Sequence, residues 1–302
     1  MTLQRKIQLV IISVIPMILI VGVYILIKVP APVDEPEVVV EEVVVAEVPV
    51  VPFMEQRVIG TSVEGRAIDA VTFGSGEKHL LFVGGIHGGY EWNSSLLAYT
   101  MIEHIQANPE MIPQGIQVSI IPVLNPDGLF TVTRTEGVFT VADVPDPSIR
   151  VAEGRFNAND VDLNRNFDCK WAPESSWRGN VVSAGTGVFS EPEAQTLRDF
   201  VGTIRPEAVV FWHSKANNVY ASECENGVLP ETLAVMSAYA QAASYGEVPV
   251  FDAYPITGDA EGWLASIGIP AVTVELETAN SIEWVRNLAG TNALLEMYKI
   301  AQ

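Results

Sequence analysis

Basic residues are scarce in this sequence. Its 302 residues include 17 Lys and Arg against 37 Asp and Glu, which gives a formal net charge of −20 at pH 7. A protein that binds nucleic acid neutralises phosphate groups with a basic surface, so this composition argues against a nucleic-acid partner. Charged residues make up only 18% of the chain and hydrophobic residues 48%, a balance that excludes a largely disordered protein and allows a sizeable core.

Charge is absent from one long stretch near the N-terminus. Residues 8–27 hold no charged side chain, and Arg5 and Lys6 precede them while Lys28 follows. A helix of this length spans about 30 Å, the thickness of the hydrocarbon layer, which predicts a single membrane anchor over residues 1–28. The flanking charges place the rest of the chain outside the cytoplasm. A cleaved signal peptide is the alternative, but its apolar core is usually about 7–15 residues long and ends at an A-x-A site, which is lacking here.

Residues 29–53 differ in composition from both neighbouring segments. They contain five Pro, eleven Val and six acidic residues, and no basic residue. Scattered prolines and repeated acidic side chains disfavour a packed helix or a paired strand, so we expect an extended, self-repelling tether. Residues 54–302 then form the third segment, whose length suits one sizeable folded domain.

Within residues 54–302, apolar runs typical of strands alternate with amphipathic segments typical of helices. This alternation predicts an α/β domain with a sheet buried between helices. Residues 125–128 predict a type I turn, and residues 190–193 read as a capping box that begins a helix. We expect a hairpin over 58–74, strands at 80–84, 118–124, 208–212 and 272–275, and helices at 93–105, 190–204, 231–244 and 281–300.

Two of the four histidines lie at the carboxyl end of a predicted strand or just after it. Ligands of α/β sheets bind at these strand ends. His87 and Glu91 follow one strand, and His213 ends another. Either histidine alone could be a hydrogen-bonded structural residue, but with Glu91 they form a His₂Glu set, a three-ligand zinc site with the fourth position open for water. His79 and His104 are expected in a surface turn and on a helix face.

Two further sets of polar residues stand out. Arg155, Asp162, Asn164 and Arg165 crowd one short stretch, and a guanidinium beside amide donors suits bidentate binding of a carboxylate. An ion-pair network within a loop is the structural alternative. Glu275 lies at the end of a predicted buried strand, where an unpaired carboxylate is costly and therefore needs a partner or a function.

In chain order, His87 with Glu91, the run VDLNRNF at 161–167, the pair His213-Ser214 and the run TVEL at 273–276 resemble the signatures of the zinc carboxypeptidases related to carboxypeptidase A. The resemblance extends from Arg57 to the C-terminus and implies that residues 54–302 are a zinc peptidase catalytic domain. It implies a mixed, mostly parallel central sheet flanked by helices. It also implies hydrolysis of the C-terminal peptide bond of peptide substrates that carry a free carboxylate.

The resemblance implies the metal site and its chemistry. His87, Glu91 and His213 would hold one Zn²⁺ per chain, and Asp162 would fix the orientation of His87. Glu275 would be the general base that takes a proton from the water that zinc activates.

The resemblance also implies how substrate binds. Arg155 would stabilise the oxyanion together with zinc, and Asn164 and Arg165 would bind the C-terminal carboxylate. Tyr254 would close over the substrate, because the family has a mobile tyrosine nine residues before a tryptophan and Trp263 stands at that distance here.

The sequence departs from the family at one ligand. Two residues usually separate the histidine and the glutamate of the first motif, whereas Gly88, Gly89 and Tyr90 separate His87 from Glu91 here. Tyrosine is a poor zinc ligand, and the two glycines could absorb one extra residue. We therefore expect Glu91 to be the ligand.

Specificity rests on Glu261, which occupies the family's position in the pocket for the C-terminal side chain. With Asp259 nearby, charge complementarity predicts a basic or amine-bearing terminal residue. Capping of a helix that begins near Gly262 explains both acids equally well. An outward-facing hydrolase could also act on peptidoglycan stem peptides, whose diaminopimelate offers a carboxylate and an amine.

Cys169 and Cys224 are the only cysteines, and each follows a proposed site segment. In an exported domain such a pair favours a disulfide, and two free buried thiols are the alternative.

Three functions fit the sequence. The first is a zinc carboxypeptidase. The second is a peptidoglycan amidase or N-acyl amino acid deacylase, which needs the zinc and Glu275 but not the clamp for a terminal carboxylate. The third, a non-catalytic cell-surface binding module, would tolerate loss of Glu275 or Arg155. Because both residues are present, we favour catalysis.

Overall fold

The computed structural model describes residues 53–299. The predicted anchor over 1–28 and the tether up to residue 52 lie outside the described residues, so both stay predictions. Among residues 53–299, no helix combines the length and the apolar character needed to cross a membrane.

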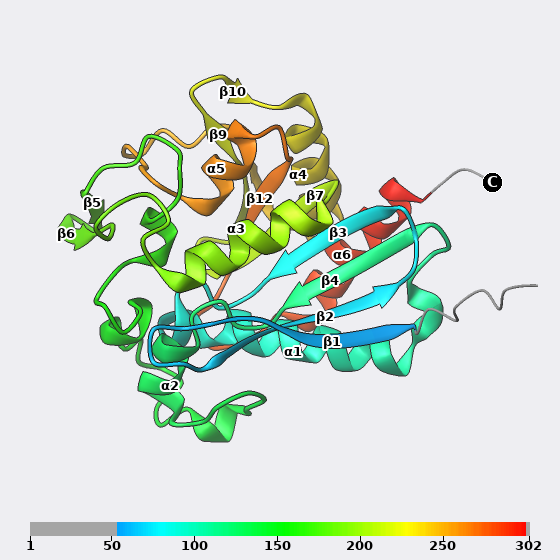
Figure 1. Ribbon diagram of the computed structural model, residues 1–302. Coiled ribbons are helices and arrows are strands. Elements are labelled where there is room, and N and C mark those ends of the chain that lie inside the picture. Colours follow the sequence, from blue (N-terminus) through cyan, green and yellow to red (C-terminus); the bar gives the residue numbers. More distant parts are fainter. Residues whose placement is uncertain (1–52, 300–302) are drawn as a thin grey trace, which may run out of the picture. The chain divides into compact units, whose positions relative to one another are not determined.

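A mixed sheet of eight strands runs through the described part of the chain (Figure 1). The strand order is β1-β2-β4-β3-β7-β12-β8-β11. Four neighbouring pairs are parallel, namely β4 with β3, β3 with β7, β7 with β12 and β8 with β11. The strands are β1 (Met54–Thr61), β2 (Ala67–Gly74), β3 (Lys78–Val83), β4 (Ile116–Ile121), β7 (Ala208–Ser214), β8 (Asn218–Ala221), β11 (Gly246–Val248) and β12 (Ala271–Leu276).

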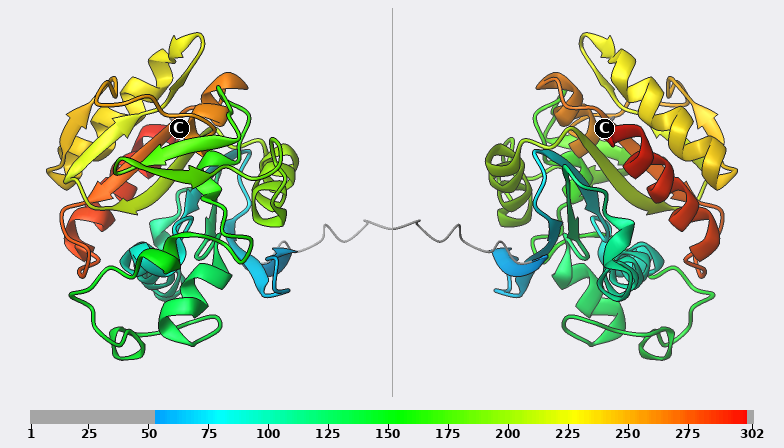
Figure 2. Two further views of the ribbon diagram at one scale, coloured as in Figure 1. Left: turned by 90° about the vertical axis from the view of Figure 1, so that its left-hand side faces the viewer. Right: turned by 90° about the vertical axis from the view of Figure 1, so that its right-hand side faces the viewer.

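Helices cover both faces of this sheet. On one face lie α1 (Trp92–Ala107), α4 (Pro230–Ala243) and α6 (Trp284–Tyr298), and on the other α3 (Pro192–Ile204) and α5 (Ala260–Ser266). Figure 2 shows α4 (yellow) and α6 (red) on the opposite side of the sheet from α3 (yellow-green). The mixed, mostly parallel sheet flanked by helices is therefore confirmed.

The central strand β7 shows why the sequence folds this way. All seven of its residues are buried, because the helical layers exclude water from both sides. Its side chains alternate between the two cores: Trp212 packs with α1, α4 and α6, whereas Phe211 packs with α3 and α5. A continuous apolar run is what such a strand requires, and this is the signal that predicted it.

The remaining elements are short. Two small hairpins are formed by β5 (Glu174–Trp177) with β6 (Asn180–Ser183) and by β9 (Glu223–Cys224) with β10 (Gly227–Val228). The other helical segments are α2 (Pro126–Thr133) and the 3₁₀ turns η1 (Gly88–Glu91), η2 (Pro109–Met111), η3 (Val141–Asp143), η4 (Ala152–Arg155) and η5 (Leu163–Arg165).

The predicted type I turn at 125–128 is wrong. These residues begin α2, with Asn125 at the N-cap, where its side chain accepts a hydrogen bond of 2.8 Å from the backbone N–H of Gly128. Pro126 takes the first helical position, where its missing N–H costs nothing. Asn, Pro, Asp and Gly are typical both of type I turns and of the first residues of helices. Here the apolar residues that follow continue the chain as a helix.

Two other local predictions are also wrong. The helix α3 is present, but no capping box forms, because Glu191 is the N-cap without a capping hydrogen bond and Ser190 donates to the Glu191 carboxylate. His79 does not lie in a surface turn. It belongs to β3, is buried, and places Nε2 2.8 Å from the hydroxyl of Ser119.

Candidate active site

Three neighbouring strands bring the predicted site residues to one edge of the sheet. Strands β3, β7 and β12 are adjacent and parallel, so their carboxyl ends lie together. His87 follows β3, His213 lies near the end of β7, and Glu275 lies near the end of β12. The sheet thus assembles residues that are far apart in the sequence.

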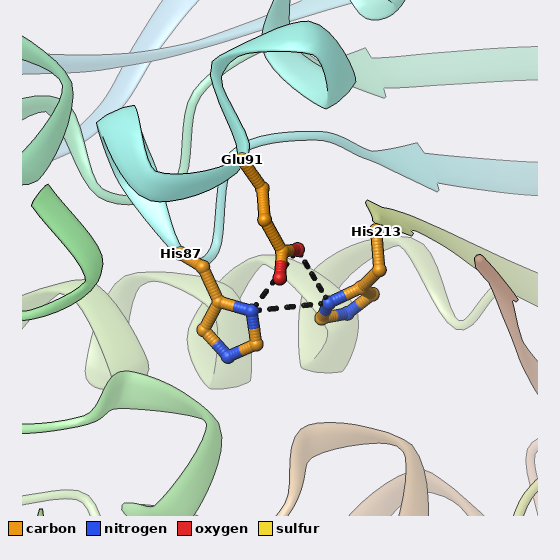
Figure 3. A group of neighbouring side chains, drawn as sticks. All are labelled: His87, Glu91 and His213. Atoms are coloured by element: carbon orange, nitrogen blue, oxygen red, sulfur yellow. Dashed lines mark hydrogen bonds and ion pairs between the residues drawn. The ribbon is translucent and has the colours of Figure 1, made fainter. Parts of the chain in front are cut away.

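His87, Glu91 and His213 converge on one buried point (Figure 3). Nδ1 of His87 and Nδ1 of His213 lie 3.1 and 3.0 Å from Oε2 of Glu91, and 3.2 Å from each other. One ligand atom from each of the three residues falls within a span of 4.8 Å. Two imidazole nitrogens and a carboxylate oxygen are a zinc donor set, so the residues fit this metal.

The electrostatics of the cluster favour a bound cation. Burial works against the charged form of Glu91, but the neighbouring His87 and His213 hold its pKa well below the usual range. Burial likewise lowers the pKa of His213, yet the Glu91 and Glu261 carboxylates raise it to about 10. A metal ion would replace the protons that these carboxylates attract.

The extra residue of the first motif is absorbed by η1. Gly88 has φ +44°, and a Cβ there would lie 2.7 Å from backbone atoms of Gly128 and Gly154. Tyr90 is buried and meets Trp177 edge-on, with 5.0 Å between the ring centroids. The guanidinium carbon of Arg150 lies over the Tyr90 ring, 3.7 Å from its centroid. The tyrosine therefore packs against Trp177 and Arg150, and Glu91 is the residue that lies beside the histidines.

Asp162 lies behind His87 and is paired with Arg155. Oδ1 of Asp162 is 3.6 Å from Nε2 of His87, and Oδ2 lies 2.8 Å from both Nε and Nη2 of Arg155. Burial would raise the pKa of Asp162, but Arg155 and then His87 hold it far below its ordinary value. The paired guanidinium is thereby fixed, with Nη1 3.9 Å from Oε1 of Glu91.

Arg150 is a site residue that sequence reasoning missed. Its Nη2 donates to Oε1 of Glu91 at 3.1 Å and to the carbonyl of Ser214 at 2.7 Å, and it is the guanidinium above Tyr90. It belongs to a loop without hydrophobic periodicity or a recognisable motif, so no local signal marks it. Arg150 ties Glu91 to the end of β7.

Glu275 has the environment of a proton acceptor. Its Oε2 is buried and has no hydrogen-bond partner among residues 53–299. Burial, together with the negative charge of Glu91, raises the pKa of Glu275 to about 7. A carboxylate whose pKa lies near neutrality can take up a proton and release it again.

The predicted substrate residues line a cavity of about 430 Å³ beside the metal cluster. Oδ1 of Asn164 accepts a hydrogen bond of 2.8 Å from the backbone N–H of Ala260. Arg165 is buried and donates through Nη1 to the carbonyl of Asn164, while its Nε has no hydrogen-bond partner in the described part of the chain. Tyr254, 46% exposed, lines the same cavity next to Phe251.

The two acids near α5 have different partners. Asp259 is the N-cap of α5, and its side chain accepts from the N–H of Gly262 at 2.7 Å, so helix capping explains this residue. Glu261 lies in the first turn of α5, where its charge also favours the helix N-terminus, but it is not the N-cap. It lines the cavity, but its Oε1 lies 3.2 Å from Nε2 of His213 and accepts a hydrogen bond from Thr273.

Cys169 and Cys224 form a disulfide with their Cα atoms 6.0 Å apart. The bond joins the loop after η5 to β9. It therefore links two segments next to the cavity.

The chain matches the sequence model of a family described as "Zinc carboxypeptidase" over residues 51–285. It is 24% identical over 247 residues to gamma-D-glutamyl-L-diamino acid endopeptidase 1 of Lysinibacillus sphaericus. That alignment covers 74% of this chain and 61% of the relative. It is 26% identical to a zinc carboxypeptidase of Simulium vittatum, over 74% of this chain and 78% of that protein.

A solved structure shows the same fold. The crystal structure of murein-tripeptide amidase MpaA from Escherichia coli O157 aligns with a TM-score of 0.59 and 23% identity, over 83% of this chain and 94% of that chain.

Proposed function

Because the chain belongs to the zinc carboxypeptidase family, we propose that it is a zinc-dependent carboxypeptidase that hydrolyses the C-terminal peptide bond of peptides. One observation carries this proposal. The buried His₂Glu cluster, the buried acid Glu275 and the partly unpaired guanidinium of Arg165 line a single cavity. A proton acceptor and a binding group for a carboxylate thus lie beside a metal site.

Zinc held by His87, Glu91 and His213 would supply a Lewis acid that activates water and polarises a carbonyl. Glu275 takes the proton from the attacking water and delivers it to the amine nitrogen of the leaving residue. Arg155 stabilises the negative charge that develops on the carbonyl oxygen. Because its pairing with Asp162 already fixes the guanidinium, little reorganisation is needed.

Substrate position is set by Asn164 and Arg165, which bind the C-terminal carboxylate in the proposed complex. The Nε–H of Arg165 is a buried donor with no hydrogen-bond partner among residues 53–299, and such a donor is suited to this task. Tyr254, at the exposed edge of the cavity, covers the bound residue. A terminal carboxylate held in this way places the last peptide bond next to the metal cluster.

A second candidate substrate is a peptidoglycan stem peptide. One relative is named an endopeptidase for gamma-D-glutamyl-L-diamino acid bonds, and one structural neighbour is named a murein-tripeptide amidase. Six cationic and five carboxylate side chains line the cavity, and the cationic ones suit substrates that carry several carboxylates. The cationic residues lining it are Arg150, Arg155, Arg165, Lys170, Arg178 and Lys215. The predicted anchor would hold the enzyme outside the cytoplasm, where such peptides occur.

The test uses the full chain, loaded with zinc, on a C-terminally diverse peptide pool and on peptidoglycan stem peptides, with mass spectrometry as the readout. We expect sequential loss of single C-terminal residues, stopped by a chelator and restored by zinc. Cleavage of stem peptides alone would select the second substrate. Stoichiometric zinc without hydrolysis of either set would overturn the proposed activity in favour of a binding module.

A further inference from the structure

Each imidazole of the metal cluster has a buried carboxylate at its second ring nitrogen. Behind His87 this partner is Asp162, with 3.6 Å between Nε2 and Oδ1. Behind His213 it is Glu261, with 3.2 Å between Nε2 and Oε1. The family resemblance accounts for Asp162, whereas it implies a different role for Glu261, that of contacting the substrate side chain.

The carboxylate of Glu261 is held in place on several sides. The residue is 3% exposed and lies in the first turn of α5, which Asp259 caps. Thr273, on β12, donates its hydroxyl to the same Oε1 at 2.9 Å. Oε1 therefore accepts a hydrogen bond from Thr273 on β12 and lies at ion-pair distance from His213 on β7, whose Nε2 has no hydrogen bond among residues 53–299.

This arrangement has a chemical consequence for His213. A neutral imidazole carries a proton on one nitrogen and a lone pair on the other. If Nε2 carries the proton and faces Glu261, the lone pair is on Nδ1, the atom that faces Glu91 and His87. Carboxylates placed in this way orient the ring and strengthen it as a metal ligand.

We propose that Glu261 is a positioning residue, which fixes the ring and tautomer of His213 and thereby raises the affinity of the site for zinc. The inference rests on the proposed function only in taking the cluster to be a zinc site. It replaces the expectation that Glu261 mainly selects basic C-terminal residues.

The test measures zinc affinity on the full chain without substrate, by competition with a chromophoric chelator. Glu261→Ala removes the partner, Glu261→Gln keeps its size but not its charge, and Thr273→Val removes the hydroxyl that holds it. We expect about 10- to 100-fold weaker zinc binding for Glu261→Ala, and smaller losses for the other two. Glu247→Gln, at an exposed glutamate in β11, is the control for loss of one negative charge and should bind zinc like the wild type.

Two further readouts keep the inference falsifiable. Circular dichroism shows whether each variant is folded, and the visible absorption of the Co²⁺-loaded protein reports the ligand field at His213, which we expect to change in Glu261→Gln. Zinc affinity within twofold of the wild type in folded Glu261→Ala would overturn the proposal. Should the wild type bind zinc but cleave nothing, the proposed function fails, while the affinity ratio still decides the role of Glu261.

Discussion

Glu275 stands directly opposite His213 on the neighbouring parallel strand. The pairing of β12 with β7 therefore fixes the distance between a proposed general base and a proposed metal ligand through backbone hydrogen bonds. Loops move more readily than central strands, so this placement keeps the proton acceptor at a constant distance from the metal cluster. The relationship makes Glu275 the first residue to test.

Glu275→Gln should keep the metal and lose the reaction. The amide has nearly the same size but cannot accept the proton of the attacking water, so we expect kcat/KM to fall by about 10³-fold or more. Zinc content by mass spectrometry should remain one per chain. Glu277→Gln, two residues further on and outside the cavity, is the matched control and should retain activity. Full activity of Glu275→Gln would rule out the general-base role.

Arg165→Lys should weaken substrate binding more than it slows chemistry. A lysine keeps the charge but loses the planar fork that binds a carboxylate through two hydrogen bonds. We expect kcat/KM to fall by about 100-fold, chiefly through KM. Peptides with an amidated C-terminus give the control, because the wild type should cleave them poorly and Arg165→Lys should reduce their cleavage little further. An equal loss on free and amidated peptides would contradict the assignment.

The strands and the polar residues at their ends could be predicted because these signals are local. Val209, Val210 and Phe211 form an apolar run long enough for a buried strand, and polar residues at the ends of such strands meet at one edge. His87 and His213 were found in this way. The cluster depends on the order of strands in the sheet, which the ordered motifs supplied through the family resemblance.

Contacts made only by tertiary packing could not be predicted. Arg150 reaches Glu91 across a gap of 59 residues in the sequence, and nothing in its own loop marks it. Glu261 meets His213 only because α5 packs against the face of the sheet that carries β7 and β12. In both cases the residue type is visible in the sequence, but its partner is set by the orientation of a separate element.

Gly88→Ala should disrupt the metal cluster. A Cβ at this position meets the backbone of Gly128 and Gly154 at 2.7 Å, and φ is +44°. The matched control is Gly137→Ala, where φ is +76° but no atom of residues 53–299 lies within 4 Å of the added carbon. Both variants meet the strain of a left-handed backbone, about 1 kcal/mol. Only Gly88→Ala should also lose zinc binding, measured by chelator competition, and equal behaviour of the two would show that the close approach does not matter.

The protein should become less stable as the pH falls from about 6.5 to about 4, because His79 has a lower pKa in the folded protein than in the unfolded chain. Burial, with a contribution from the charge of Arg57, lowers the pKa of His79 from 6.5 to about 4 in the folded protein. Between these values the unfolded chain binds a proton that the folded protein does not, so the free energy of unfolding decreases as the pH falls.

His79→Gln removes this proton but can still reach the hydroxyl of Ser119, which lies 2.8 Å from Nε2 in the wild type. Urea unfolding at pH 4.5 and pH 7 should therefore show a smaller loss of stability in His79→Gln than in the wild type, by no more than about 3 kcal/mol. Above about pH 8 the two proteins should show the same pH dependence, because a histidine with either pKa is almost entirely neutral there. Identical curves across the acidic range would mean that His79 is protonated in the folded protein at little cost.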